Sequence, residues 1–195
     1  MTLGNPGIQI VHPRGRAAVV HINDSFTGAD GTNLNGWTPD VENTPGNTWS
    51  AVLQNWSIVS ECARGTNYLF SLLVIESGVS DCVLTMPVTR GGNQNGIVFR
   101  YIDNSNYWYA TLSSVDGFAI MEVNGGVKTK RSGLSITMSA LETMTVTLSG
   151  NSISVNWNGS DLSYNSALHA TATKHGIMRQ DWVNNGTADW WDLTG

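Results

Sequence analysis

The chain has 195 residues, a formal net charge of -5 and an apolar content of 41%, but its charged content is only 13%. This length allows one large domain that buries a core without disulfide bonds. The acidic balance and the scarcity of lysine and arginine argue against a nucleic-acid partner, because phosphate backbones are bound by clustered cations.

Residues 1–22 differ from the rest of the chain and are predicted to form an N-terminal arm. Prolines and glycines interrupt two short extended pieces, Ile8–Val11 and Ala17–Ile22. Such an arm can attach to a neighbouring subunit by adding a strand to its sheet; the alternative is that both pieces are strands of the domain itself. We expect no secretory signal, because no cation precedes Arg14, and no apolar stretch is long enough to span a membrane.

From residue 23 to residue 195, short alternating stretches separated by Gly and Asn turns predict an all-β antiparallel domain. Besides two hairpins, the expected strands are Ser57–Ser60, Tyr68–Ile75, Val79–Val88, Phe118–Val123, Leu134–Met138, Gly176–Arg179 and Asp189–Leu193. Segments 27–48 and 158–175 are expected to be long loops. So many strands in one domain predict two packed sheets, as in a sandwich or jelly roll.

The first hairpin is predicted within Gly96–Ser114, with its turn at Asn104-Ser105. The pairs expected on its apolar face are Tyr101 with Trp108, Phe99 with Ala110, and Ile97 with Leu112. The opposite face then carries Arg100 opposite Tyr109, with Tyr107 beside them. An arginine flanked by two tyrosines is suited to sugar binding, and the alternative is a stacked surface pair without a ligand.

The second hairpin is predicted within Met144–Trp157, with a two-residue turn at Gly150-Asn151. Both turn residues tolerate the positive φ angles that tight hairpin turns require. The expected pairs are Leu148 with Ile153, Val146 with Val155, and Met144 with Trp157, all on one apolar face.

A second group of candidate ligand-binding residues follows the last predicted strands. Arg179, Asp181 and Trp182 lie in the sequence MRQDWVNNG, which is expected to form a rim loop, and Trp37 in the long early loop is a further candidate. For each aromatic residue the alternative is packing. The tryptophans assigned to the core are Trp49, Trp108, Trp157 and Trp191.

No metal or cofactor is expected. The best places for calcium are Asp30–Asn33 and Asp103–Asn106, but the second is better explained as a hairpin turn. Cys62 and Cys82 are expected to be buried free thiols, with a single disulfide as the alternative.

Catalysis is not expected either. Glycoside hydrolysis needs two neighbouring carboxylates, and Asp189 and Asp192 are spaced so that a strand would put them on opposite faces. No G-x-S-x-G nucleophile motif is present.

The order of motifs from Asn23 to Gly195 resembles a known superfamily. It runs from Asp24-Ser25-Phe26 through GADGTNLNGWTPD, Trp49, GIVFRYIDNSNYWYA and TVTLSGNSISVNWNG to Trp191-Asp192-Leu193. This pattern is similar to the concanavalin A-like, laminin-G-like jelly-roll superfamily, and most similar to domains of phage tail and other virion surface proteins. The resemblance implies a curved two-sheet sandwich with adjacent terminal strands and ligands on the concave sheet or rim loops.

The chain departs from two branches of that superfamily. Its glutamates do not fall in the Glu-x-Asp-x-x-Glu spacing of the endoglucanases, and it has no Asp/Glu cluster like that of the legume-type lectins. The resemblance therefore implies a non-enzymatic phage virion surface protein, of the tail or capsid, which binds other virion proteins through its arm and is present in many copies. Host-surface glycans are the expected ligands. The alternatives are a purely structural decoration or tail subunit, and a carbohydrate-active enzyme or its sugar-binding module.

Overall fold

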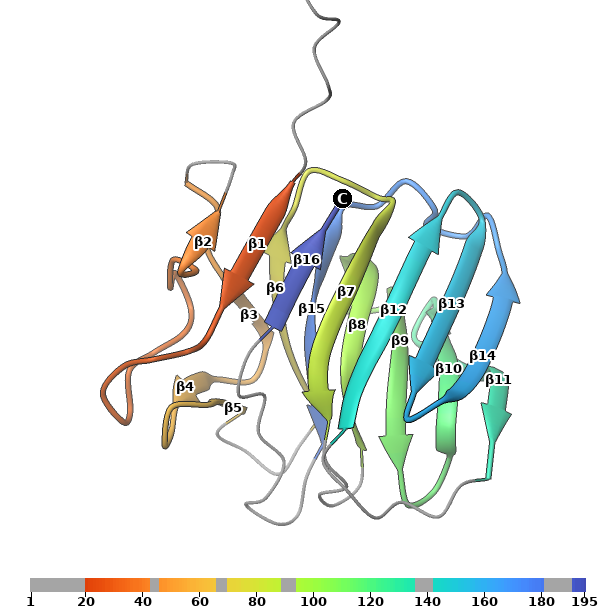
Figure 1. Cartoon of the computed structure of the whole chain (residues 1–195), viewed down its shortest axis with the longest axis horizontal. Helices are drawn as coiled ribbons and strands as arrows, with labels where there is room; N and C mark the ends of the chain where they lie inside the picture. The colour runs from red at the N-terminus through yellow and green to blue at the C-terminus, as the bar shows by residue number, and fades with distance from the viewer. Residues whose placement is uncertain (1–19, 43–45, 66–69, 89–93, 136–141, 181–190) are drawn as a thin grey trace, which may run out of the picture.

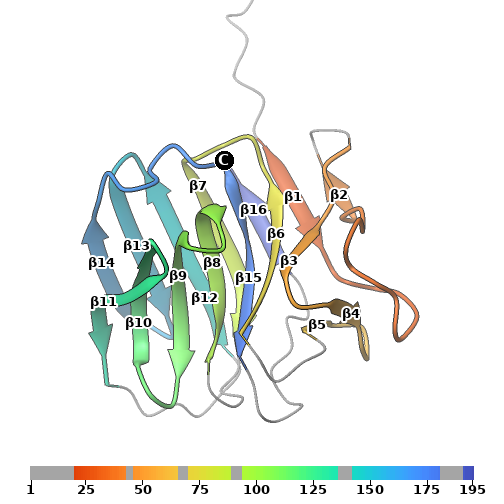
Figure 2. The same cartoon turned by 180° about the vertical axis from the view of Figure 1, so that it is seen from behind.

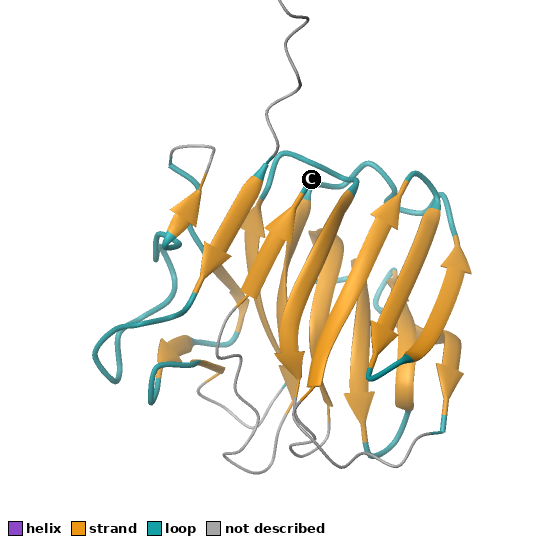
Figure 3. Cartoon of the chain, in the orientation of Figure 1, coloured by secondary structure: helices purple, strands orange, loops and turns teal. Residues whose placement is uncertain are grey.

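The computed structural model describes residues 20–42, 46–65, 70–88, 94–135, 142–180 and 191–195. Every regular element in these ranges is a β-strand (Figure 3). The strands form two large antiparallel sheets that pack face to face, which we call the front and back sheets from their positions in Figure 1. The prediction of an all-β, two-sheet jelly-roll sandwich is therefore confirmed.

The strands of the front sheet, in order across it, are β14 (Ser160–Asn165), β13 (Ser152–Trp157), β12 (Glu142–Ser149), β7 (Cys82–Val88), β16 (Trp191–Thr194), β1 (His21–Asp24) and β2 (Val41–Glu42). The back sheet, which faces the viewer in Figure 2, contains β11 (Val127–Leu134), β10 (Gly117–Asn124), β9 (Asn106–Ser113), β8 (Gln94–Asp103), β15 (Lys174–Gln180), β6 (Ser71–Glu76) and β3 (Ser50–Leu53). A small separate ribbon pairs β4 (Trp56–Ile58) with β5 (Ala63–Gly65).

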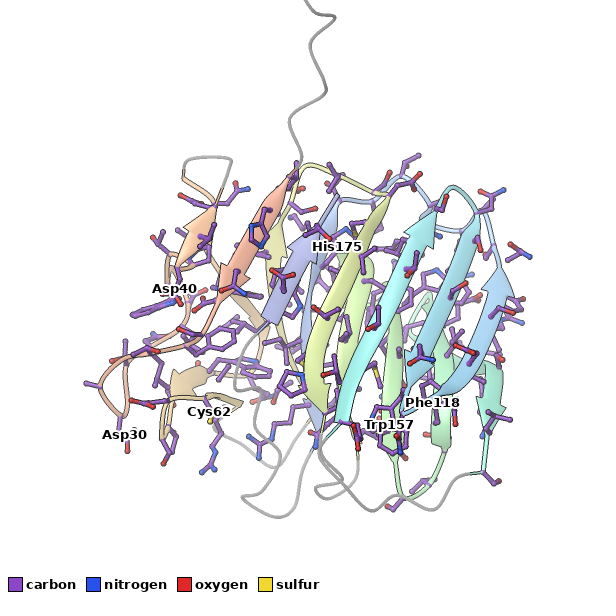
Figure 4. The ribbon with its side chains drawn as sticks, viewed as in Figure 1. Asp30, Asp40, Cys62, Phe118, Trp157 and His175 are labelled. Atoms are coloured by element: carbon purple, nitrogen blue, oxygen red, sulfur yellow. The ribbon has the colours of Figure 1, made fainter. Side chains whose placement is uncertain are left out.

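The main core lies between the two sheets because alternate residues of each strand point inward. Phe118 of the back sheet and Trp157 of the front sheet show this packing, with ring centroids 6.3 Å apart (Figure 4). The four tryptophans predicted to be in the core are all buried, and Trp56 is buried as well. Burial of so many large apolar side chains is the main favourable term for a sandwich of this kind.

The second predicted hairpin is confirmed in every pair. Met144 lies opposite Trp157, Val146 opposite Val155 and Leu148 opposite Ile153. The loop prediction for segment 158–175 is wrong at β14, which pairs with β13. The sequence prediction also missed β11, an edge strand with three exposed cations. Edge strands often carry such charges, which hide the alternation that would reveal them.

Strand β1 begins two residues before the predicted domain boundary. Ile22 is buried in the core, and Val20 exchanges backbone hydrogen bonds with Gly195, so the two ends of the described domain are adjacent. Residues 1–19, which make up most of the predicted arm, lie outside the described residues. None of the described residues forms a helix that could cross a membrane.

Both cysteines are free thiols. Cys82 is buried in the core, as predicted, whereas Cys62 is only half-buried, in the loop between β4 and β5. Burial raises the pKa of the Cys82 thiol to about 12, so this group is not a reactive thiolate at neutral pH.

Candidate functional site

A bulge in strand β8 shifts the first hairpin away from its predicted register. The turn lies at Asn104-Ser105 as expected, and Asp103 pairs with Asn106, but Phe99 then lies opposite Trp108. The prediction that Tyr101 lies opposite Trp108 is therefore wrong by two residues. Residues 100–102 have only one partner residue on β9, and such a bulge bends its strand and turns side chains in new directions.

Arg100 is the residue whose position changes most. It has a positive φ of 51°, and its side chain is fully buried between the sheets. Its guanidinium Nη2 donates to the backbone oxygen of Gly150 in the facing hairpin, and its backbone N–H donates to Nδ1 of His175 at 3.3 Å. The prediction that Arg100 lies between Tyr107 and Tyr109 on an open face is wrong, because the bulge rotates it into the core.

Tyr107 and Tyr109 do lie on the outer face of the back sheet, as predicted, but they are not open to solvent. Tyr101 was predicted on the core face and lies with them instead, because the bulge turns it outward. Tyr101, Tyr107 and Tyr109 form a continuous cluster with ring centroids 6.0 Å apart between successive members, and Tyr109 is fully buried. Burial raises the pKa of Tyr107 to about 12 and raises the pKa of Tyr109 further. These rings therefore stabilise the sheet rather than offering a stacking surface for a ligand.

Two contacts cover this tyrosine cluster. The bent tip of the β8–β9 hairpin reaches across the sheet, where Asn104 Nδ2 donates to the backbone oxygen of Val52 on β3 at 3.2 Å. The ring of Phe70 packs on Tyr109 with centroids 5.8 Å apart, and the ammonium of Lys128 lies 3.9 Å from the Phe70 ring centroid. The bulge is thus what brings the hairpin tip over the face that was predicted to be open.

A shallow open pocket lies beside the bent hairpin tip, where β6 ends and β15 begins. We call it the rim pocket. Its volume is about 200 Å³. The residues that line it are Glu76, Tyr101, Ile102, Ala172, Thr173 and Lys174. They come from the end of β6, the bulge of β8 and the start of β15, and Ile102 is half exposed. The pocket therefore combines an apolar surface with one anion and one cation.

The polar groups of the rim pocket are only partly engaged within the protein. Glu76 Oε1 accepts a hydrogen bond from the Gly78 N–H at 3.0 Å, and Tyr101 donates its hydroxyl to Asn104 Oδ1 at 2.6 Å. Lys174 is exposed and makes no side-chain hydrogen bond or ion pair with the described residues. One carboxylate oxygen and one ammonium are thus available to a ligand.

The other predicted site residues are not brought into this pocket. Arg179 is buried, with 7% of its surface exposed, and Trp37 is half-buried against the core. Asp181 and Trp182 lie outside the described residues, so their ligand-binding role remains a prediction.

In the loops considered for calcium, the aspartate oxygens accept backbone hydrogen bonds: Asp103 within its own turn, and Asp30 from the loop between β4 and β5. Asp30, in the outer loop (Figure 4), accepts the Ser60 N–H at 2.7 Å, and Asp103 accepts the Ser105 N–H at 2.7 Å. Residues that the structure describes contain no group of three or more Asp, Glu, His or Cys side chains arranged for a metal.

Sequence reasoning missed the residues that define the rim pocket. Glu76 and Lys174 lie on β6 and β15, far apart in the sequence, and neither belongs to a recognisable motif. The chain has only three lysines, and this scarcity was the one signal that could have drawn attention to Lys174. Nothing local in the sequence, however, pairs Lys174 with Glu76.

Comparisons with known proteins show similarity in fold to solved structures. No sequence family and no curated protein matches the chain. Among solved structures, it is similar to the exoplasmic/lumenal domain of VIP36 in a Ca²⁺/Man-bound form, with a TM-score of 0.56 and 11% identity over 89% of this chain and 88% of that one. It is also similar to the carbohydrate-binding module CBM66 from Bacillus subtilis, with a TM-score of 0.54 and 13% identity over 84% of this chain and 94% of that one.

At such low identity these likenesses concern the fold alone. They support the two-sheet β-sandwich fold that the resemblance in the sequence implied. They do not bear on a phage tail or other virion role.

Proposed function

We propose that the chain is a non-catalytic glycan-binding domain and that the rim pocket is its binding site. The observation that supports this most is the composition of the pocket, where the apolar side chain of Ile102 lines the same wall as the carboxylate of Glu76 and the ammonium of Lys174. Sugars present both C–H faces and hydroxyls, so they need an apolar contact together with a few well-placed polar groups. The two similar structures, a carbohydrate-binding module and a domain in a Ca²⁺/Man-bound form, agree with this proposal.

The chemistry of the pocket favours binding over cleavage. Glu76 is the one carboxylate among the lining residues, whereas glycoside hydrolysis ordinarily uses two carboxyl groups placed on either side of the bond. A carboxylate that already accepts one backbone hydrogen bond can accept others from sugar hydroxyls.

A site this small and shallow binds weakly by itself. Affinity near 1 mM corresponds to about -4 kcal/mol, and display of many copies on one particle raises avidity by roughly 10² to 10⁴-fold. The experiment must therefore use a multivalent form of the protein.

A glycan array probed with the multimerised protein tests the proposed function. We expect Ile102→Asn and Glu76→Gln each to lower the array signal about tenfold, since one removes the apolar contact and the other the negative charge. Their melting temperatures should stay close to wild type, because Ile102 is half exposed and the Gln amide oxygen can still accept the Gly78 N–H.

The matched control is Val115→Asn, which changes an aliphatic residue with 79% exposure in the β9–β10 turn. It should keep the full signal. Equal signals from wild type, Ile102→Asn and Glu76→Gln on the same glycans would rule out the rim pocket as the site, and a blank array for the wild type would overturn glycan binding itself.

We also propose a virion setting for this domain, with the part of the predicted arm that precedes β1 as the attachment to other virion proteins. The support is the sequence resemblance from Asn23 to Gly195. Deleting residues 1–19 leaves β1 intact and tests the attachment: a folded protein that no longer enters particles is expected. Particle incorporation at the wild-type level would contradict it, and neighbouring tail or capsid genes would support the setting independently.

A further inference from the structure

We propose that the rim pocket selects an acidic sugar, that is, a glycan residue that carries a carboxylate beside a hydroxyl or amide donor. This inference rests on the proposed function and names the ligand class of the same site. It starts from three residues that lie directly opposite one another on adjacent strands: Glu76 on β6, Lys174 on β15 and Tyr101 on β8.

Opposite charges at directly paired positions of neighbouring strands ordinarily attract and stabilise the sheet. Here Glu76 and Lys174 form no ion pair, although they are partners in the ladder. The Glu76 carboxylate instead receives the Gly78 N–H at 3.0 Å, in the turn that follows β6. The ammonium of Lys174 is left without an internal partner in the described part of the chain.

Glu76 and Lys174 both line the rim pocket, so a ligand there must offer hydrogen-bonding groups that suit both of them. An anion or strong acceptor satisfies Lys174, and a hydrogen-bond donor satisfies the remaining oxygen of Glu76. A simple anion has no hydrogen-bond donor, so the Glu76 carboxylate would repel it. A neutral sugar would offer Lys174 only uncharged acceptors. A sugar with both a carboxylate and a neighbouring hydroxyl or amide N–H meets both demands, and charge-assisted hydrogen bonds are about twice as strong as neutral ones.

The size of the pocket agrees with a single sugar residue. Its volume of about 200 Å³ is below the ~300–1,000 Å³ typical of sites for drug-sized ligands. The exposed side chain of Ile102 lies beside the two charged groups and can contact the C–H face of the ring.

Matched sugar pairs displayed at equal density test this inference. The pairs are β-linked glucuronate with glucose and galacturonate with galactose, and the multimerised wild type should bind each acid about five- to tenfold more strongly than its neutral partner. Lys174→Met should bring the acid-to-neutral ratio close to one, and Lys174→Arg should restore the preference. Raising the salt concentration should reduce the ratio, because Lys174 is exposed and screened by ions.

The control variant is Lys130→Met, which removes the same charge from an exposed lysine of β11 outside the pocket. It should keep the wild-type ratio. Equal or stronger binding of the neutral sugars would overturn the acidic preference and leave glycan binding intact, whereas no binding of any sugar would overturn the proposed function. Galactose 6-sulfate bound as strongly as galacturonate would overturn the assignment to a carboxylate.

Discussion

Gly176→Ala and Gly96→Ala are each expected to destabilise the domain by about 3 kcal/mol or more. The two glycines lie on the adjacent strands β15 and β8 of the back sheet, opposite Val98 and Met178 respectively, where the strands leave no room for a side chain. A Cβ at Gly176 would lie 2.1 Å from the Leu73 backbone oxygen, and a Cβ at Gly96 would lie 1.8 Å from the Ala110 backbone oxygen. Backbone atoms of paired strands cannot move aside without breaking the ladder.

Urea unfolding of the purified variants measures this effect. Gly133→Ala is the control, because it is also a glycine of the back sheet but its Cβ would lie no closer than 3.2 Å to any neighbour. We expect that variant to lose less than about 1 kcal/mol. If Gly176→Ala unfolded at the same urea concentration as Gly133→Ala, the close strand approach beside the rim pocket would be incorrect.

The stability of the wild type is expected to change little between pH 4 and pH 6, because two buried groups oppose each other. Burial lowers the pKa of His175 from 6.5 to about 4, and burial raises the pKa of Asp24 from 3.8 to about 6. As the pH falls through this range, the unfolded chain protonates its histidine and the folded chain does not, which favours unfolding. Over the same range the folded chain protonates Asp24 while the unfolded chain keeps a carboxylate, which favours folding.

Single variants should separate the two contributions, each about 3 kcal/mol across its window. With Asp24→Asn, stability should fall as the pH drops from about 6.5 to 4, since only His175 remains. With His175→Gln, stability should rise as the pH drops from about 6 to 4, since only Asp24 remains. The readout is the slope of unfolding free energy against pH, because both variants also lose buried hydrogen bonds.

Those lost hydrogen bonds lower the absolute stability without affecting the slope. Asp24 accepts the Trp49 indole N–H at 2.7 Å and the Phe26 N–H at 2.8 Å, and His175 Nε2 donates to the Val79 oxygen at 3.0 Å. Parallel pH slopes for the two variants would contradict the assigned protonation states.

The fold could be predicted from the sequence because its strongest signals are local. In the Met144–Trp157 hairpin, the alternation and the Gly150-Asn151 turn specify the same register, and all three predicted pairs occur. The hydrophobic pattern also assigned Trp49, Trp108, Trp157 and Trp191 correctly to the core, although it did not assign Trp56. Strands such as β14 and β11 were missed because polar and charged residues dominate them, so their alternation is weak.

The register of the first hairpin could not be predicted in the same way. A shift of two residues leaves Ile97 and Phe99 on their predicted core face, so alternation before the bulge cannot distinguish the predicted pairing from the observed one. The difference lies at Arg100, which points inward and donates to the Gly150 oxygen of a hairpin fifty residues later in the chain. Such a distant partner has no signature near Arg100, and the rim pocket that depends on this bulge was missed for the same reason.

The most direct test of the rim pocket is an NMR titration of the labelled domain with the best glycan from the array. We expect the largest amide shift changes at the ends of the strands that form the pocket, at Glu76, Ile102 and Lys174. Thr147 and Ser154, on the outer face of the front sheet, should not change. Saturable shifts confined to the front sheet, with the pocket amides unmoved, would contradict the account.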